Sequence, residues 1–147
     1  MKGVSIKTAD LEFGLKNEDK NIPVLRKMFG EDLAKTTNKF SPRDFFNQNF
    51  YIEQKSRKIK STDYDDYMIG ANKIEDALKA DRNYIIVFDL IDGTFFYQFN
   101  KDHLGNGIEK RMGGRFDRKD SSGNLIDERK LCYYIHKRLL TRINRDI

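Results

Sequence analysis

The stretch that decides the fold reads Ser41-Pro42-Arg43-Asp44-Phe45-Phe46-Asn47-Gln48-Asn49-Phe50-Tyr51-Ile52-Glu53-Gln54-Lys55-Ser56-Arg57-Lys58. It places an aspartate shortly after a proline and an acid-x-lysine triplet at the end of an aromatic run. Aromatic and β-branched residues favour strands. The pattern therefore predicts a hairpin of residues 40–46 and 49–56 that turns at Asn47-Gln48.

Strand alternation decides which side chains of the triplet meet. Successive side chains of a strand point to opposite faces, so Glu53 and Lys55 share one face while Gln54 points to the other. If Asp44 lies on the partner strand, its carboxylate can meet that of Glu53. Mg²⁺ keeps several waters and binds through one or two carboxylates plus substrate phosphate. The arrangement can therefore hold a divalent metal beside a phosphodiester.

Acid-x-lysine triplets also arise by chance in a chain so rich in charge, and short motifs give many false matches. Three others occur, Glu18-Asp19-Lys20, Asp117-Arg118-Lys119 and Glu128-Arg129-Lys130. Glu53 differs from these because it alone follows a candidate hairpin and alone has an upstream Pro-x-Asp. We therefore base the functional hypothesis on Glu53.

At these residues the chain resembles the PD-(D/E)xK nuclease superfamily, which includes restriction enzymes, Holliday-junction resolvases and repair nucleases. Pro42-Arg43-Asp44 and Glu53-Gln54-Lys55 carry the pattern, with Arg43 inserted between the proline and the aspartate. Two further stretches, Tyr67 to Ile74 and Val87 to Tyr97, make the chain resemble small endonuclease-like domains of giant DNA viruses. The resemblance covers roughly residues 15–140.

The resemblance implies an α/β (α+β) fold of the restriction-endonuclease type, a central mixed β-sheet flanked by helices. It implies a metal-dependent endonuclease that hydrolyses phosphodiester bonds, in DNA rather than RNA, with resolvase-like action on branched DNA as one form. Asp44 and Glu53 would bind Mg²⁺, for which Mn²⁺ can substitute, and the backbone carbonyl of Gln54 would be a further ligand. Lys55 would orient or help deprotonate the attacking water.

Two more residues are candidates for auxiliary roles. Glu18 resembles an additional helix acid that some superfamily members use as a metal ligand, although Pro23 complicates its placement in a helix. Lys73 lies beside the apolar stripe of a predicted helix, where it could face the metal site. The alternative for Lys73 is a solvated surface lysine.

The basic residues nearest the triplet are candidates for nucleic-acid binding. Arg57 and Lys58 directly follow the predicted strand that carries Glu53. In Lys110-Arg111-Met112-Gly113-Gly114-Arg115 the glycines allow close backbone approach, and Lys110, Arg111 and Arg115 can pair with phosphate oxygens. The alternative for this segment is a solvated hairpin turn. The net charge of +5 agrees with a polyanionic partner, although it is also compatible with an ordinary solvated surface.

Periodicity predicts the remaining elements. We expect a helix over residues 22–29 that ends at Gly30, and a second helix over residues 64–80 capped by Thr62 or Asp63. A buried strand follows over 84–90, and Asp92-Gly93 turns into a strand over 94–99. Two elements near 114–118 and 130–140 can be strands or a strand and a helix.

Length and composition predict one PD-(D/E)xK nuclease-like domain over residues 1–147. A single cysteine, Cys132, indicates a reducing compartment. No long apolar run indicates a signal peptide or membrane span. We expect a soluble protein of the host cytoplasm or nucleus, or of a virion. Its expected partner is nucleic acid, and we expect no membrane association. The sequence leaves open whether the protein forms a homodimer.

Two other classes of function stay open. A non-catalytic nucleic-acid-binding module would use the basic surface without requiring Asp44, Glu53 and Lys55 to converge. A virion-associated structural protein would need neither metal nor nucleic acid. Whether the three side chains meet in one cleft is the observation that separates the first alternative from a nuclease.

Overall fold

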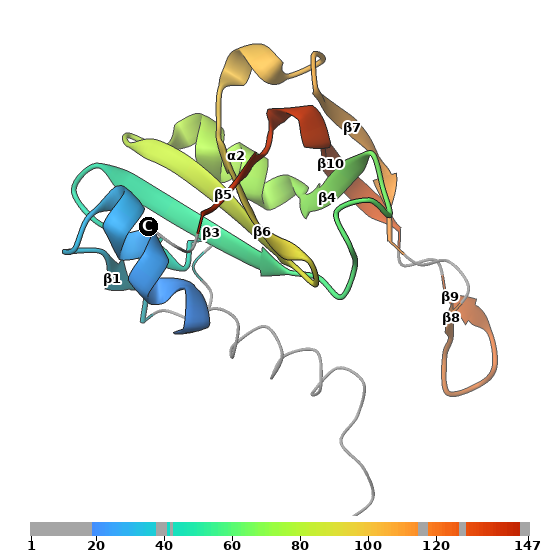
Figure 1. Cartoon of the computed structure of the whole chain (residues 1–147). Coiled ribbons are helices and arrows are strands. Elements are labelled where there is room, and N and C mark those ends of the chain that lie inside the picture. Colours follow the sequence, from blue (N-terminus) through green and yellow to red (C-terminus); the bar gives the residue numbers. More distant parts are fainter. Residues whose placement is uncertain (1–18, 38–40, 42, 115–117, 127–128, 145–147) are drawn as a thin grey trace, which may run out of the picture.

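A six-stranded mixed sheet forms the centre of the computed structural model, which describes residues 19–37, 41, 43–114, 118–126 and 129–144. Its strand order within these residues is β1 (Ala34–Lys35), β2 (Phe45–Phe46), β3 (Phe50–Ser56), β5 (Asn83–Leu90), β6 (Gly93–Gln98) and β11 (Thr141–Arg142). β3 and β5 run parallel, with Glu53 opposite Ile86, and the other neighbouring pairs are antiparallel. The long strands cross the middle of Figure 1.

A second, antiparallel sheet of the described chain consists of β4 (Asp66–Gly70), β10 (Lys130–His136) and β7 (Ile108–Gly113). Two short 3₁₀ turns connect this sheet to the large sheet. Lys101–His103 lies between β6 and β7, and Lys137–Leu139 lies between β10 and β11. A small ribbon of β8 (Arg118–Lys119) and β9 (Leu125–Ile126) lies apart from both sheets in Figure 1.

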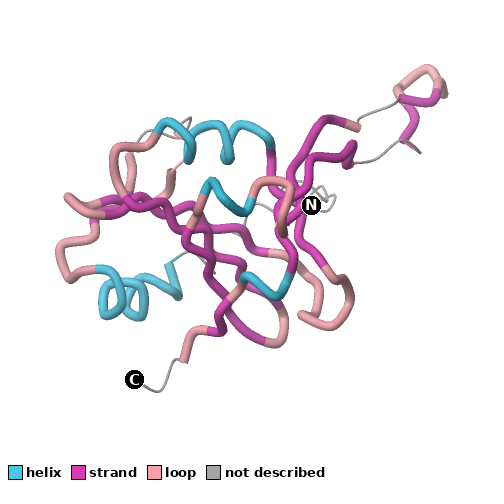
Figure 2. The backbone as a smooth tube through the Cα atoms, turned by 90° about the horizontal axis from the view of Figure 1, so that it is seen from above, coloured by secondary structure: helices cyan, strands magenta, loops and turns pink. Residues whose placement is uncertain are grey.

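The two faces of the large sheet bury different cores. On one face Tyr51, Ile86 and Phe88 pack with residues of the second sheet and with Ile74 of helix α2 (Ala71–Lys79). On the other face Ile52 and residues of β5 pack with Leu25 of a helix over residues 19–29. Figure 2 shows the two helices on opposite sides of the strands. The α/β class and the helix-flanked mixed sheet predicted from the sequence are confirmed.

The predicted helix over residues 64–80 is wrong in its first half. Residues Asp66–Gly70 form strand β4, and α2 begins only at Ala71. Tyr67 and Ile69 are buried while their neighbours are partly exposed, a period of two, and the Tyr67 ring packs against Phe88 at 5.4 Å. Pairing with β10 therefore overrides the helical spacing of the apolar residues.

Other elements agree with the sequence prediction more closely. The strands over 84–90 and 94–99 appear as β5 and β6, and the first helix includes residues 19–21 in addition to the predicted 22–29. In the last third the element near 130–140 is strand β10 followed by a 3₁₀ turn, whereas residues 115–117 of the element near 114–118 lie outside the described residues. Lys110 to Gly113 belong to strand β7 rather than to a hairpin turn. Gly113 is buried there, and a Cβ at this position would lie 2.7 Å from Met68 Sδ and would also clash with the Tyr134 hydroxyl, so the strand has no room for a side chain at this point.

None of the helices in the described part of the chain combines the length and the apolar character needed to cross a membrane.

Candidate active site

Strand β3 presents Glu53 and Lys55 to the face of the sheet that α2 covers. The Glu53 side chain is buried, with 2% of the residue exposed. Its Oε1 lies 3.3 Å from Lys55 Nζ and 3.0 Å from Lys73 Nζ. Alternation along β3 brings Lys55 to this carboxylate, and α2 brings Lys73. One carboxylate oxygen therefore has two ammonium partners from two elements.

Asp44 lies next to this carboxylate at the start of the β2–β3 hairpin. Its backbone N–H donates to the Ile52 carbonyl at 2.8 Å, which continues the strand pairing beyond Phe45. Its Oδ2 accepts from the backbone N–H of Gln54 at 2.7 Å. The charge of Asp44 also raises the pKa of Glu53. The hairpin thus brings the two acids together through backbone hydrogen bonds.

Burial is the main electrostatic influence on Glu53. The pKa of the carboxyl is raised from 4.5 to about 7, first by burial and then by the charge of Asp44, while Lys55 and Lys73 act in the opposite direction. Glu53 Oε2 is buried and makes no hydrogen bond within the described structure. A buried carboxylate oxygen without a partner is costly. This oxygen is therefore available to a ligand that carries positive charge.

The donor set suits a hard divalent cation. Asp44 and Glu53 offer carboxylate oxygens, the ligands that Mg²⁺ and Mn²⁺ prefer. The Gln54 side chain points to the opposite face, so only its backbone carbonyl is a candidate ligand. Within the described residues no group of three or more His, Cys, Asp or Glu side chains gathers around one point. An ion here would therefore keep positions for water and substrate, as Mg²⁺ commonly does.

The comparison with known families agrees with this geometry. A family model described as "Phage putative PDDEXK endonuclease" matches residues 43–141, two thirds of the 147-residue chain. The chain belongs to this family. Its members are grouped as endonucleases, which act on nucleic acid, and PDDEXK nucleases generally use divalent metal ions. A search of curated proteins and a search of solved structures returned no match.

Arg43 has a structural role in this PDDEXK domain that the sequence analysis missed. Its guanidinium bonds Asp76 of α2 through two contacts of 2.9 Å and lies 3.6 Å from the centre of the Tyr51 ring. It thereby ties the segment that carries Asp44 to the helix that carries Lys73. The sequence offered no signal for this pair, because the two residues are 33 positions apart.

The auxiliary candidates have different outcomes. Lys73 contacts Glu53 directly, and its side chain is 13% exposed, so it is not the solvated surface lysine of the alternative. Glu18 lies outside the described residues, and so does Arg115. The described part of the first helix starts at Asp19, the residue after Glu18. The Asp19 carboxylate forms an ion pair with Lys35 Nζ at 2.9 Å.

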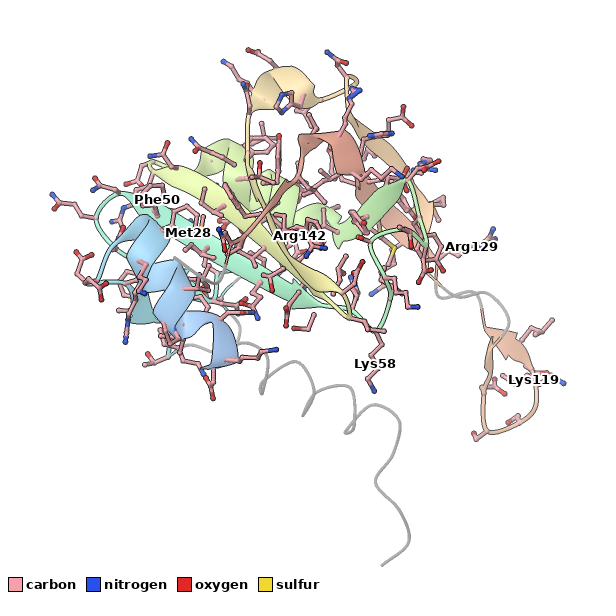
Figure 3. All side chains as sticks on the ribbon, viewed as in Figure 1. Met28, Phe50, Lys58, Lys119, Arg129 and Arg142 are labelled. Atoms are coloured by element: carbon pink, nitrogen blue, oxygen red, sulfur yellow. The ribbon has the colours of Figure 1, made fainter. Side chains whose placement is uncertain are left out.

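The predicted nucleic-acid-binding residues do not share one face. Arg57 is partly buried, and Lys58 is exposed beyond the end of the large sheet (Figure 3). Lys110 and Arg111 are neighbours on β7 and point to opposite faces. Arg111 pairs with Asp66 and lies over the Tyr134 ring at 4.0 Å, whereas Lys110 lies 5.7 Å from the Tyr133 ring. The two side chains therefore lie on opposite faces of the second sheet.

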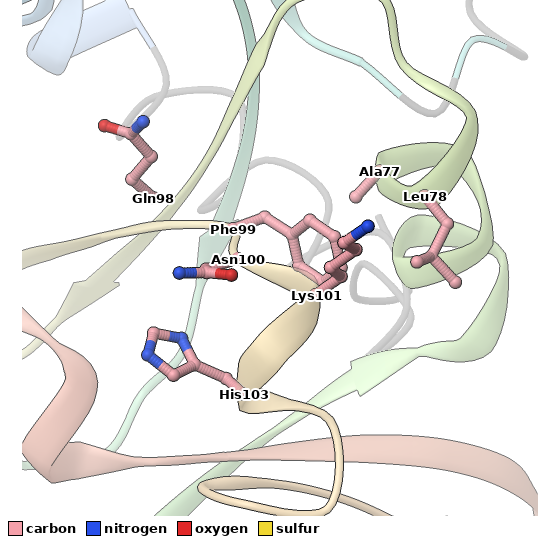
Figure 4. A pocket seen from close by; sticks show the side chains of 7 residues that line it. All are labelled: Ala77, Leu78, Gln98, Phe99, Asn100, Lys101 and His103. Carbon is pink, nitrogen blue, oxygen red and sulfur yellow. The ribbon is translucent and has the colours of Figure 1, made fainter.

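A pocket of about 510 Å³ lies away from the acids, between the end of α2 and the Lys101–His103 turn (Figure 4). Its lining residues are Ala77, Leu78, Gln98, Phe99, Asn100, Lys101 and His103. They include no carboxylate, and His103 Nδ1 is bonded to the Tyr97 hydroxyl at 2.7 Å. This hollow therefore lacks the acids that metal-assisted chemistry needs.

Proposed function

We propose that the chain is a metal-dependent endonuclease that hydrolyses phosphodiester bonds, with DNA as its main substrate. The observation that carries the proposal is the environment of Glu53. One of its oxygens is paired with Lys55 and Lys73, the other is buried without a hydrogen-bond partner among the described residues, and a second carboxylate, Asp44, lies beside it. A carboxylate that served only to hold the fold together would have both oxygens paired.

Asp44, Glu53 and the backbone carbonyl of Gln54 would hold one or two Mg²⁺ ions, which Mn²⁺ can replace. When bound, such an ion lowers the pKa of a water and stabilises charge on the phosphoryl oxygens. The hydrogen bond from the Gln54 N–H to Asp44 Oδ2 orients the Asp44 carboxylate before any ion binds. The acids are therefore preorganised by the backbone of the hairpin.

Lys55 and Lys73 would have different roles, because their side chains differ in exposure to solvent. The Lys55 side chain is 31% exposed, so its ammonium can contact an incoming phosphate or the attacking water. Lys73 is more deeply buried and touches the same oxygen of Glu53, so it holds that carboxylate in place and favours its ionised form. We therefore assign substrate contact to Lys55 and a positioning role to Lys73.

Cleavage assays test the proposal directly. The purified protein is incubated with linear duplex, single-stranded and branched DNA and with RNA, in Mg²⁺, in Mn²⁺ or in a chelator. We expect cleavage only with metal, and loss of cleavage in Asp44→Asn and in Glu53→Gln. Because the two acids would act as one unit, each single variant should lose nearly as much activity as the double variant.

Glu75→Gln is the matched control, since Glu75 is an exposed acid on α2. It should cleave like the wild type. Full activity in chelator would contradict the metal mechanism. Metal-independent binding without cleavage of any substrate would instead identify a nucleic-acid-binding module.

A further inference from the structure

A second hollow, of about 500 Å³, lies at the end of the strand that carries Glu53 and Lys55. Arg57 forms part of its wall, and the backbone N–H of Arg57 extends the β3–β5 pairing by donating to the Asp89 carbonyl at 2.9 Å. Arg57 therefore lies on the same face of the strand as Lys55, one alternation step further on. Arg57 thus connects the hollow to the strand that carries Glu53, with Lys55 between the two along the same face.

Three tyrosines line this hollow, which we call the tyrosine pocket: Tyr64, Tyr67 and Tyr134. The Tyr67 ring is fixed by Phe88 and by a hydrogen bond from its hydroxyl to the Ser61 carbonyl at 2.9 Å. The Tyr134 ring is covered by the Arg111 guanidinium at 4.0 Å. Tyr64 is 58% exposed. The pocket therefore has two ordered aromatic walls and one exposed aromatic ring.

The polar groups of the tyrosine pocket are a cation and an acceptor. The Arg57 guanidinium donates to the Met68 carbonyl at 3.4 Å, which anchors it at the edge of β4. The Asp66 carboxylate also lines the pocket and is held by Arg111. Aromatic rings, an anchored guanidinium and a carboxylate acceptor suit a nucleobase, which offers a flat π-face, N–H donors and an adjacent phosphate.

We propose that the tyrosine pocket binds an unpaired nucleobase of the substrate strand close to the bond that is cut. The inference rests on the proposed function, because it takes the strand to pass over Asp44 and Glu53. A base in an intact duplex must first leave its stack and its partner, which costs free energy. The pocket therefore favours substrates with unpaired nucleotides, such as single strands, ends and branches, over continuous duplex.

Binding to oligonucleotides that carry 2-aminopurine tests this, because stacking quenches the fluorescence of that base. Affinity is measured in Ca²⁺ for a continuous duplex and for the same duplex with one unpaired 2-aminopurine. For wild type we expect quenching on binding and higher affinity for the unpaired form. Tyr64→Ala should abolish the quenching and weaken binding of the unpaired form by about tenfold, while leaving duplex affinity unchanged.

Two further variants make the result specific. Tyr64→Phe keeps the ring and should behave like wild type. Leu78→Ala removes an apolar side chain that is 48% exposed on α2, and it should leave both affinities unchanged. An equal loss of affinity for both oligonucleotides in Tyr64→Ala, or no loss for either, would overturn the inference.

The outcomes also separate this inference from the proposed function. Quenching that depends on Tyr64, without cleavage of any substrate, would support the pocket and remove the proposed activity. Metal-dependent cleavage without quenching would support the activity and overturn the pocket.

Discussion

The two oxygens of Glu53 have different surroundings, and this difference governs how the site responds to pH. Oε1 has two lysine partners, whereas Oε2 is buried without one in the described structure. Because burial raises the pKa to about 7, a proton competes with any cation for this carboxylate near neutral pH. Metal binding should therefore strengthen as the pH rises through 7.

The sign of the effect on stability follows from the same pKa. Between pH 4.5 and about 7 the folded protein holds a proton on Glu53 that the unfolded chain has lost. The contribution of this group to metal-free stability therefore falls as the pH rises through that window. Above about pH 7, a cation that binds the ionised Glu53 carboxylate should restore the stability of the folded protein.

We predict that Mg²⁺ raises the melting temperature more at pH 8 than at pH 6, as measured by thermal unfolding with and without the ion. Glu53→Gln should remove this difference, because an amide neither titrates nor binds the ion strongly. Glu75→Gln should retain it, since Glu75 lies exposed on α2. An equal metal-induced shift at both pH values in wild type would count against Glu53 as a ligand.

Lys55 should matter for turnover more than for binding. Its charge lies 3.3 Å from Glu53 Oε1 and is needed most when negative charge builds up on the phosphate. We predict that Lys55→Ala binds DNA in Ca²⁺ with wild-type affinity and cleaves orders of magnitude more slowly in Mg²⁺. Lys55→Arg should also cleave poorly, because a planar guanidinium cannot replace a compact ammonium. Wild-type turnover in either variant would show that the triplet is a chance match.

At the scale of elements, the Arg43–Asp76 pair joins the hairpin to α2. Two charge-assisted contacts of 2.9 Å in a partly buried position are stronger than an exposed ion pair. We predict that Arg43→Met lowers the free energy of unfolding by about 1–3 kcal/mol. It should also lower turnover, because α2 would no longer hold Lys73 against Glu53. Chemical denaturation and cleavage rates measure the two effects.

Arg82→Met provides the control for this prediction. Arg82 also lies over the Tyr51 ring, at 4.6 Å, and donates to the Asn47 carbonyl at 2.7 Å, outside α2. It should therefore lower stability without a comparable loss of turnover per folded molecule. Equal losses of turnover in both variants would mean that α2 docking is not what Arg43 contributes.

The sequence was sufficient for the elements whose signals are local. The hairpin around Glu53 was predictable because aromatic and β-branched residues are concentrated in it, and β5 because its apolar run is continuous. Strand β4 was missed because Tyr67, Ala71 and Ile74 also fit a helical stripe, and only pairing with β10 decides between the two. Local patterns cannot show such pairing.

The same limit applies to the candidate site. Asp44, Glu53 and Lys55 were found together because all three lie within one hairpin. Lys73 was placed correctly on a helix, but its contact with Glu53 depends on how α2 packs against the sheet. The partner of Arg43 likewise lies on that helix and could not be read from the sequence.

At the scale of the whole molecule, the distribution of charge matters more than the net value of +5. Phosphate contacts release counterions, so DNA binding should weaken linearly on a log–log salt plot. We predict that Lys58→Ala, next to the tyrosine pocket residue Arg57, flattens this slope by about one unit with little change in sequence preference. Lys110→Ala is the control, because Lys110 points to the other face from Arg111. Equal slopes for wild type and Lys58→Ala would place the nucleic acid elsewhere.

The single cysteine of the chain, Cys132, allows the opening of the second sheet to be measured by thiol labelling. Cys132 is buried on β10 opposite Gly70, the residue directly before α2. A thiol reagent can reach it only while these strands are apart, so the labelling rate reports how often they open. Opening at Gly70 also frees the start of the helix that carries Lys73. The half-time of Cys132 labelling, with and without metal, therefore measures how long the assembled site persists between openings.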